Sequence, residues 1–213
     1  SWTITQIWNT HWHPDHAGGN LAIKEACHKA GGECTISAPA AEAARIAGID
    51  REVAHGDTVS LGGYTAQVID VGGHTLGHIA YYLPEAGMAL VGDAVFALGC
   101  GRMFEGTPEQ FWASLERIRA LPPETMLYCA HEYTAANAKF AVHADPDNAA
   151  LADYAAEISD KRGRGEPTVP MPLSRELATN PFLRADTPAM QARWGGNAPE
   201  ETFAALRAAK DSF

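Results

Sequence analysis

A cluster of metal-capable side chains near the start of the chain restricts its fold more than any other feature. Residues 9–20 read NTHWHPDHAGGN and place three histidines and one aspartate within six positions. His11 and His13 are two apart in an extended segment, so both imidazoles point to the same side. A proline then ends the extension, and Asp15 and His16 can turn towards a second position. The stretch therefore predicts ligands for metal at two neighbouring positions.

Three further candidate ligands follow predicted strands elsewhere in the chain. The stretches TAQVIDV, MALVG and TMLYCA lead to His74, Asp93 and His131, and the stretch TITQIW leads to His11. Strand ends on one edge of a packed α/β sheet converge, so we expect these side chains to meet at one site. Three or four nitrogen and oxygen ligands per ion are typical of a catalytic site. Imidazole and carboxylate without cysteine suit zinc, iron or manganese.

Other histidines lack this pattern. His28, His55 and His143 stand alone, and each is interpreted as an ordinary surface or hydrogen-bonded residue. His78 is expected to support the ligands from behind rather than to bind metal. Without its context, Asp93 could equally be a helix cap.

Strand-like and helix-like stretches alternate over the first two thirds of the chain and then give way to helices alone. The first part is typical of an α/β domain, with an alanine-rich helix expected over residues 39–48. A helix is expected from Pro108, capped by a Thr107–Gln110 capping box. After His131 the sequence predicts only helices separated by Pro and Gly clusters. We therefore expect a catalytic domain over residues 1–134 and a helical domain over residues 135–213.

Composition excludes several classes of partner. The formal net charge is −10 and the pI is near 5.3, which argues against nucleic-acid binding. No apolar run approaches the roughly 20 residues of a membrane helix, so no membrane association is expected. The four cysteines form no CxxC pair, which favours reduced thiols and a cytoplasmic location. An anionic substrate would need a local basic patch.

The stretch THWHPDHAGG resembles the THxHxDHxGG loop of the metallo-β-lactamase superfamily. Three later stretches, GDAVFALGCGRMFEGTPEQFWASL, YCAHEYTAANAKFA and LRAAKDSF, are similar to the glyoxalase II family, the hydroxyacylglutathione hydrolases. Together they cover nearly the whole chain. The resemblance implies an α/β fold, the αββα metallo-β-lactamase sandwich, followed by a small all-α C-terminal domain.

The resemblance also implies roles for individual residues. It assigns His11, His13 and His74 to one ion, Asp15, His16 and His131 to the other, and Asp93 to a bridge between them. Asp15 is expected to orient the nucleophile as well. It implies two divalent ions, with zinc expected and iron or manganese as alternatives. The side chains expected to contact glutathione are Arg102, Phe104, Tyr133, Arg207 and Lys210, with Phe104 standing where some relatives carry a tyrosine.

The implied activity is hydrolysis of a glutathione thioester such as S-D-lactoylglutathione, a step of methylglyoxal detoxification. A hydroxide bridging the ions would attack the carbonyl and release glutathione and a 2-hydroxy acid. We expect a monomer whose partner is this small molecule. A rival of the same fold is a mononuclear iron dioxygenase acting on glutathione persulfide, but the C-terminal helices fit the thioesterase better.

The family normally has a few dozen residues ahead of the metal loop, which form the first strands of the sandwich. They do not precede Ser1 in this sequence. Without them one sheet is expected to have an exposed edge and an uncovered apolar face. A third interpretation of the chain is therefore an inactive metal-binding remnant.

Overall fold

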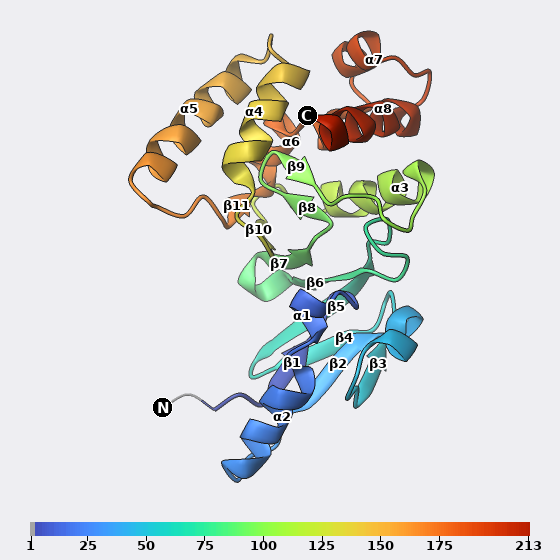
Figure 1. The fold of residues 1–213 in the computed structure, drawn as a ribbon, viewed down its shortest axis with the longest axis vertical. Coiled ribbons are helices and arrows are strands. Elements are labelled where there is room, and N and C mark those ends of the chain that lie inside the picture. The colour runs from blue at the N-terminus through green and yellow to red at the C-terminus, as the bar shows by residue number, and fades with distance from the viewer. Residues whose placement is uncertain (1–2) are drawn as a thin grey trace.

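Two β-sheets face each other in the computed structural model, which describes residues 3–213. The smaller sheet has three parallel strands in the order β1-β2-β3. Figure 1 shows it below the larger sheet, with α2 on its far side. The bounds are β1 Gln6–Trp8, β2 Thr35–Pro39 and β3 Arg51–Val53, with α1 Pro14–Ala17 and α2 Asn20–Lys29 between β1 and β2.

The larger sheet has six strands in the order β11-β10-β7-β6-β5-β4. β6 and β7 form the predicted antiparallel hairpin around residues 84–87, and β10 then joins β7 in parallel. The bounds are β4 Thr58–Leu61, β5 Tyr64–Asp70, β6 Ile79–Leu83, β7 Met88–Gly92, β10 Met126–Cys129 and β11 Met171–Pro172. A separate hairpin, β8 Val95–Phe96 with β9 Gly99–Cys100, follows β7.

Side chains of the larger sheet alternate between two apolar layers, as strand geometry requires. On β5, Val68 packs into the cluster between the two sheets, and Ile69 packs into the cluster on the outer face. On β6, Tyr81 points inward against Trp8 of the smaller sheet, with 5.2 Å between ring centroids. Both faces of these strands are therefore buried.

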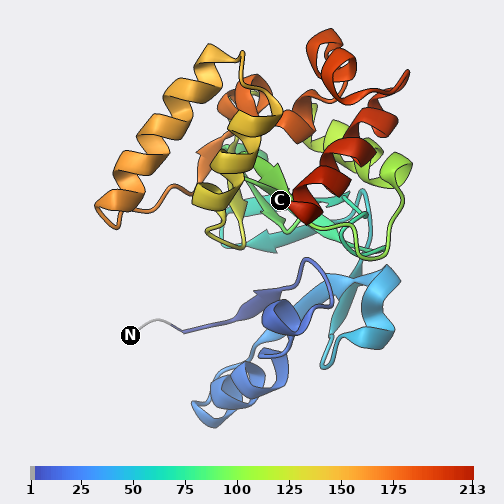
Figure 2. The same cartoon turned by 45° about the horizontal axis from the view of Figure 1, so that its top comes forward.

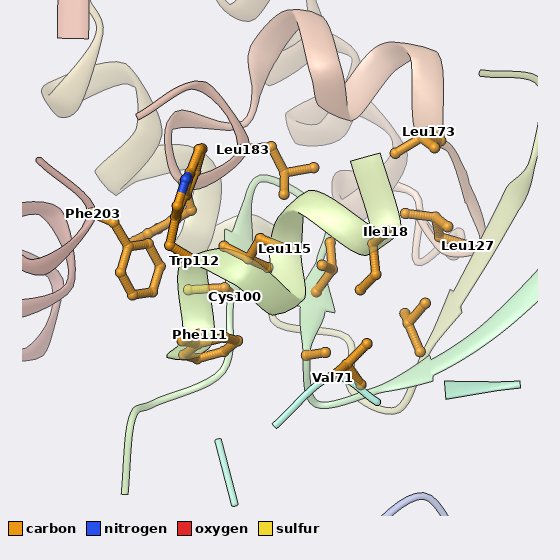
Figure 3. Close-up of a cluster of buried hydrophobic side chains, with 14 of the residues drawn as sticks. Val71, Cys100, Phe111, Trp112, Leu115, Ile118, Leu127, Leu173, Leu183 and Phe203 are labelled. Atoms are coloured by element: carbon orange, nitrogen blue, oxygen red, sulfur yellow. The ribbon is translucent and has the colours of Figure 1, made fainter. Parts of the chain in front are cut away.

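Helix α3 (Pro108–Arg119) covers the outer face of the larger sheet. Phe111, Leu115 and Ile118 are fully buried on one side of it (Figure 3). The helix also packs against α8 through an edge-to-face contact between Phe111 and Phe203. These layers give the helix-sheet-sheet-helix order that was expected.

The chain after β10 is helical apart from the short β11, as predicted. Figure 2 shows these helices gathered on the α3 side of the larger sheet. Within residues 3–213 no helix is both long and apolar enough to cross a lipid bilayer. The bounds are α4 Thr134–Ala144, α5 Ala149–Gly163, α6 Leu173–Thr179, α7 Pro188–Trp194 and α8 Pro199–Ser212, with a 3₁₀ helix η3 at Pro181–Arg184.

Two local expectations were wrong in detail. The alanine-rich run forms only a short 3₁₀ helix, η1 (Ala40–Arg45), which ends where the backbone becomes extended at Ile46. Thr107 caps α3 by accepting the Gln110 N–H, but the Gln110 side chain donates to the Leu76 carbonyl at 3.2 Å. The Gln110 side chain therefore does not complete the capping box. It connects α3 to the loop after His74 instead.

Candidate metal centre and adjoining cavity

All seven side chains predicted as ligands meet at one end of the two sheets. β5, β7 and β10 run in the same direction, so their C-terminal ends bring His74, Asp93 and His131 to one edge of the larger sheet. His11 arrives from β1 in the smaller sheet. The expectation of a single sheet edge is corrected here, because the site lies where two facing sheets end.

The first group consists of three histidines. His13 Nδ1 lies 3.0 Å from His11 Nε2 and 3.0 Å from His74 Nε2. His74 Nδ1 lies 2.8 Å from the Arg102 carbonyl, which can only accept, so Nδ1 carries the proton and Nε2 presents its lone pair. Burial lowers the pKa of His74 to about 4 and that of His11 well below its usual value. The His11 and His74 rings are therefore neutral at pH 7, as metal binding requires.

The second group consists of Asp15, His16 and His131. Asp15 Oδ2 lies 3.4 Å from His16 Nε2 and 3.2 Å from His131 Nε2. The short helix α1 produces this turn, since it begins directly after His13 and carries Asp15 and His16 on its first turn. Each group has one ligand atom per residue, all within 4.8 Å of one another.

Asp93 lies between the two groups. Its Oδ2 is 3.5 Å from His74 Nε2 and 3.6 Å from His131 Nε2, and its Oδ1 is 3.4 Å from His16 Nε2. Burial raises the pKa of the Asp93 carboxyl to about 6. Its backbone N–H donates to Nε2 of the fully buried His78 at 3.1 Å. His78 thus supports Asp93 from behind, and it remains a prediction that it binds no metal.

The donor set fits two divalent cations. His16 Nε2 and Asp93 Oδ1 are buried and have no hydrogen-bond partner among the described residues. Buried polar atoms rarely stay unpaired, and these two belong to a cluster of imidazoles and carboxylates. Nitrogen and oxygen donors without thiolate match zinc, iron or manganese and leave room for substrate.

A cavity of about 470 Å³ opens beside this cluster. Phe104 lies edge-on to His74 with 5.3 Å between ring centroids, and Tyr133 stacks on His131 at 4.9 Å. Arg102 and Lys210 line the cavity as well and give it a basic end. All five predicted substrate contacts lie on its wall, but their contacts with substrate stay predictions.

Arg207 is held in place by more hydrogen bonds than a side chain that is free to bind an anionic substrate. Its Nη1 donates to the Cys100 carbonyl at 3.0 Å, and its Nη2 donates to Asp211 Oδ1 at 2.8 Å. Only 6% of its side chain is exposed. In the structure Arg207 therefore ties α8 to the strand β9, which forms one wall of the cavity.

Sequence reasoning missed the polar side chains that hold the β8–β9 hairpin. Its turn includes Leu98, which has a left-handed backbone at φ 55°. Asn137 donates to the Ala97 carbonyl at 3.1 Å, and the Glu176 carboxylate accepts the Leu98 N–H at 2.8 Å. Asn180 donates to carbonyls on both sides of the turn. The only sequence signal was the presence of polar residues within otherwise apolar helical stretches.

The buried carboxyl of Glu176 predicts a pH dependence of stability. Burial raises its pKa from the ordinary 4.5 to about 7. Between these values the unfolded state ionises while the folded state keeps its proton, so stability falls as pH rises from 4.5 to 7, by of order 3 kcal/mol. Glu176→Gln keeps an acceptor for Leu98 and should remove this fall. Urea unfolding of both proteins at pH 5 and pH 8 measures the difference, and parallel pH dependence would contradict it.

Two family models together match the whole chain. Residues 1–131 match the metallo-beta-lactamase superfamily, and residues 132–213 match the hydroxyacylglutathione hydrolase C-terminus. The predicted division at residues 134 and 135 stays a prediction.

Curated relatives align over all of this chain and 82% of their own lengths. Proteins named hydroxyacylglutathione hydrolase are 71% identical in Erythrobacter litoralis, 63% in Hyphomonas neptunium and 54% in Maricaulis maris. Solved structures share the fold at lower identity. ETHE1 from Myxococcus xanthus superposes with a TM-score of 0.62 at 24% identity, covering 100% of this chain and 79% of that one. The BLEG-1 B3 metallo-beta-lactamase gives 0.61 at 19% identity, covering 85% and 78%.

Proposed function

Because this chain belongs to the hydroxyacylglutathione hydrolases, the glyoxalase II family of the metallo-β-lactamase superfamily, we propose that it is a binuclear thioester hydrolase. Its substrate is S-(2-hydroxyacyl)glutathione, such as S-D-lactoylglutathione, and its products are glutathione and a 2-hydroxy acid. One observation carries the proposal: two ligand groups share Asp93 beside a cavity with a basic end.

The two ligand groups would hold the two ions, with zinc as the proposed metal. His11, His13 and His74 would hold the first, and Asp15, His16 and His131 the second, with Asp93 shared. When bound, such ions lower the pKa of water from roughly 15.7 to about 7 and polarise the thioester carbonyl. The protein's part is to fix the orientation of the imidazoles, as the bond from His74 Nδ1 to the Arg102 carbonyl does for His74.

Proton transfer needs few further groups. The Asp15 carboxylate faces the cavity, and its second oxygen can hold the proton that the attacking water loses, while Asp93 is shared between the two ligand groups. The leaving group is a thiol with a free pKa of about 8.5, so it departs as thiolate with little need for a general acid. The four cysteines are unpaired in the structure, and none is required as a nucleophile.

The basic end of the cavity suits an anionic thiol peptide. Arg102 is 64% exposed and only loosely paired with Asp211 at 3.7 Å, so its guanidinium is open to substrate. Lys210 lies on the same face of α8 as Arg207 and lines the cavity. In a protein of net charge −10, these cations supply the local attraction that the substrate carboxylates need.

Replacing Lys210 by Ala should raise KM for S-D-lactoylglutathione roughly tenfold, or about 1.4 kcal/mol, with little change in kcat. The reason is that an ammonium remote from the thioester carbonyl binds ground state and transition state equally. Lys139→Ala, an exposed lysine on α4 outside this cavity, is the control. Steady-state kinetics of both variants measure KM and kcat. A fall in kcat with unchanged KM for Lys210→Ala would count against a binding role.

Thioester hydrolysis tests the proposed function directly. The purified protein should consume S-D-lactoylglutathione, followed by loss of thioester absorbance, and should release one thiol per turnover. The rival dioxygenase would instead consume oxygen in the presence of glutathione persulfide. Two ligand groups sharing a carboxylate favour the hydrolase, since the dioxygenase needs one iron only. Oxygen uptake without thioester loss would overturn the proposal.

Location and assembly are further parts of the proposal. Four unpaired cysteines suit a reducing compartment, so we place the enzyme in the cytoplasm. Every predicted ligand and substrate contact comes from one chain, so a monomer is sufficient for activity.

A further inference from the structure

The three histidines of the first ligand group come from two separate loops. His11 and His13 lie after β1 in the smaller sheet, whereas His74 lies after β5 in the larger sheet. The two loops must keep a fixed spacing if their nitrogens are to converge on one ion. Something other than the ion itself has to set that spacing, because the loops belong to different sheets.

Glu42 lies between these two loops. Its Oε2 accepts the backbone N–H of Trp12 at 2.7 Å, and its Oε1 accepts the backbone N–H of Gly77 at 2.9 Å. Trp12 is the residue between His11 and His13, and Gly77 is three residues after His74. One carboxylate therefore bonds to the backbone of both loops.

The packing shows that this position is built for the carboxylate. Glu42 is only 3% exposed, and the guanidinium of Arg45 on the same 3₁₀ helix bonds to Glu105 instead. A Cβ on Gly77 would lie 2.7 Å from Glu42 Cγ, so only glycine permits this approach. A buried carboxylate is costly unless its oxygens are satisfied, and here two backbone donors satisfy them.

Arg45 and Glu105 form a second connection between the same two loops. Arg45 lies over the Trp12 ring at 3.4 Å and bonds to Glu105 Oε1 at 2.6 Å. Glu105 Oε2 accepts the Leu76 N–H at 3.0 Å. The short helix η1 thus contacts the His11–His13 loop through both Glu42 and Arg45, and it reaches the His74 loop directly through Glu42 and indirectly through Glu105.

We infer that Glu42 is a positioning residue for the first ion: it holds the His11–His13 loop and the His74 loop at the spacing that lets three imidazoles bind one metal. The inference rests on the proposed binuclear site. In the second group, His131 follows β10 and lies outside both loops, and Asp15 and His16 lie beyond Trp12 on helix α1. Loss of the carboxylate should therefore weaken one site selectively.

Glu42→Gln is the sharpest variant because it keeps the size of the side chain. Its amide oxygen can accept from one backbone N–H, but its NH₂ then faces the other N–H, donor against donor. We expect zinc to bind about tenfold to a hundredfold more weakly at one site and with unchanged affinity at the other. Glu42→Ala should show the same selectivity, and Glu116→Gln, at an exposed position on α3, should leave both affinities unchanged.

The measurement is zinc binding to the full chain by competition with a chromophoric chelator, with circular dichroism as a check on folding. Selective weakening of one site in a folded Glu42→Gln protein supports the inference. Two wild-type affinities in that variant, or equal weakening of both sites, would overturn it.

This readout needs no substrate and is therefore separate from the proposed activity. If wild type binds two ions and hydrolyses no thioester, the proposed function fails while the role of Glu42 can still be decided. If wild type hydrolyses the thioester and Glu42→Gln binds both ions normally, the inference alone fails.

Discussion

Replacing Asp93 by Ala is expected to lower kcat/KM for S-D-lactoylglutathione by at least roughly a thousandfold, because the residue is shared by both ligand groups. No other side chain in the cluster lies between the His74 and His131 nitrogens. Its loss should also reduce the metal content from two ions per chain to one or fewer. Elemental analysis and steady-state kinetics on the same preparation measure both effects.

Asp147→Ala provides the matched control. That carboxylate is 92% exposed and lies outside the ligand cluster, so neither metal content nor activity should change. A folded Asp93→Ala protein that keeps two ions and near-normal turnover would rule out a bridging role.

The second large effect is expected from Gly101→Ala, a change of a single methyl group. A Cβ at this position would lie 2.1 Å from the Asp93 carbonyl oxygen and 2.9 Å from His74 Nδ1. The first contact is with backbone, so either the Asp93 segment or the segment at Gly101, directly after β9, must shift. A misplacement of about 1 Å in a catalytic group can cost about a hundredfold in rate, and we expect a loss of at least that size.

Gly63→Ala is the control for Gly101→Ala, because nothing lies within 4 Å of the added carbon. Kinetics at saturating zinc separate a geometric defect from simple metal loss. Full activity of Gly101→Ala at saturating zinc would show that the site tolerates the shift and would refute the steric argument.

The clustering of the candidate ligands could be predicted from sequence because it depends on local features of the chain. His11, His13 and His16 lie within one short run, and the distant ligands follow apolar strands whose ends converge. The alternation of strands and helices and the helical C-terminal region were predictable for the same reason, whereas the αββα layers were implied by the family resemblance. Hydrophobic periodicity and glycine and proline positions report on local structure.

Apart from His78, the residues that support the site could not be predicted, because their roles depend on contacts with residues distant in sequence. Glu42 is one carboxylate in an alanine-rich run, and its partners lie 30 and 35 positions away. Glu176 contacts Leu98 across 78 positions. Arg207 was predicted from the resemblance as a substrate contact. In the structure it also donates a hydrogen bond to β9. Such side chains are recognised only when the fold brings their partners together.

Zinc content measured together with turnover tests the binuclear thioesterase most directly. The purified chain should be stripped with a chelator, titrated with zinc and assayed with S-D-lactoylglutathione at each step. We predict that activity rises to a maximum near two ions per chain and is lost again on chelation. Saturation at one ion per chain, or full hydrolysis by the metal-free protein, would contradict a binuclear mechanism.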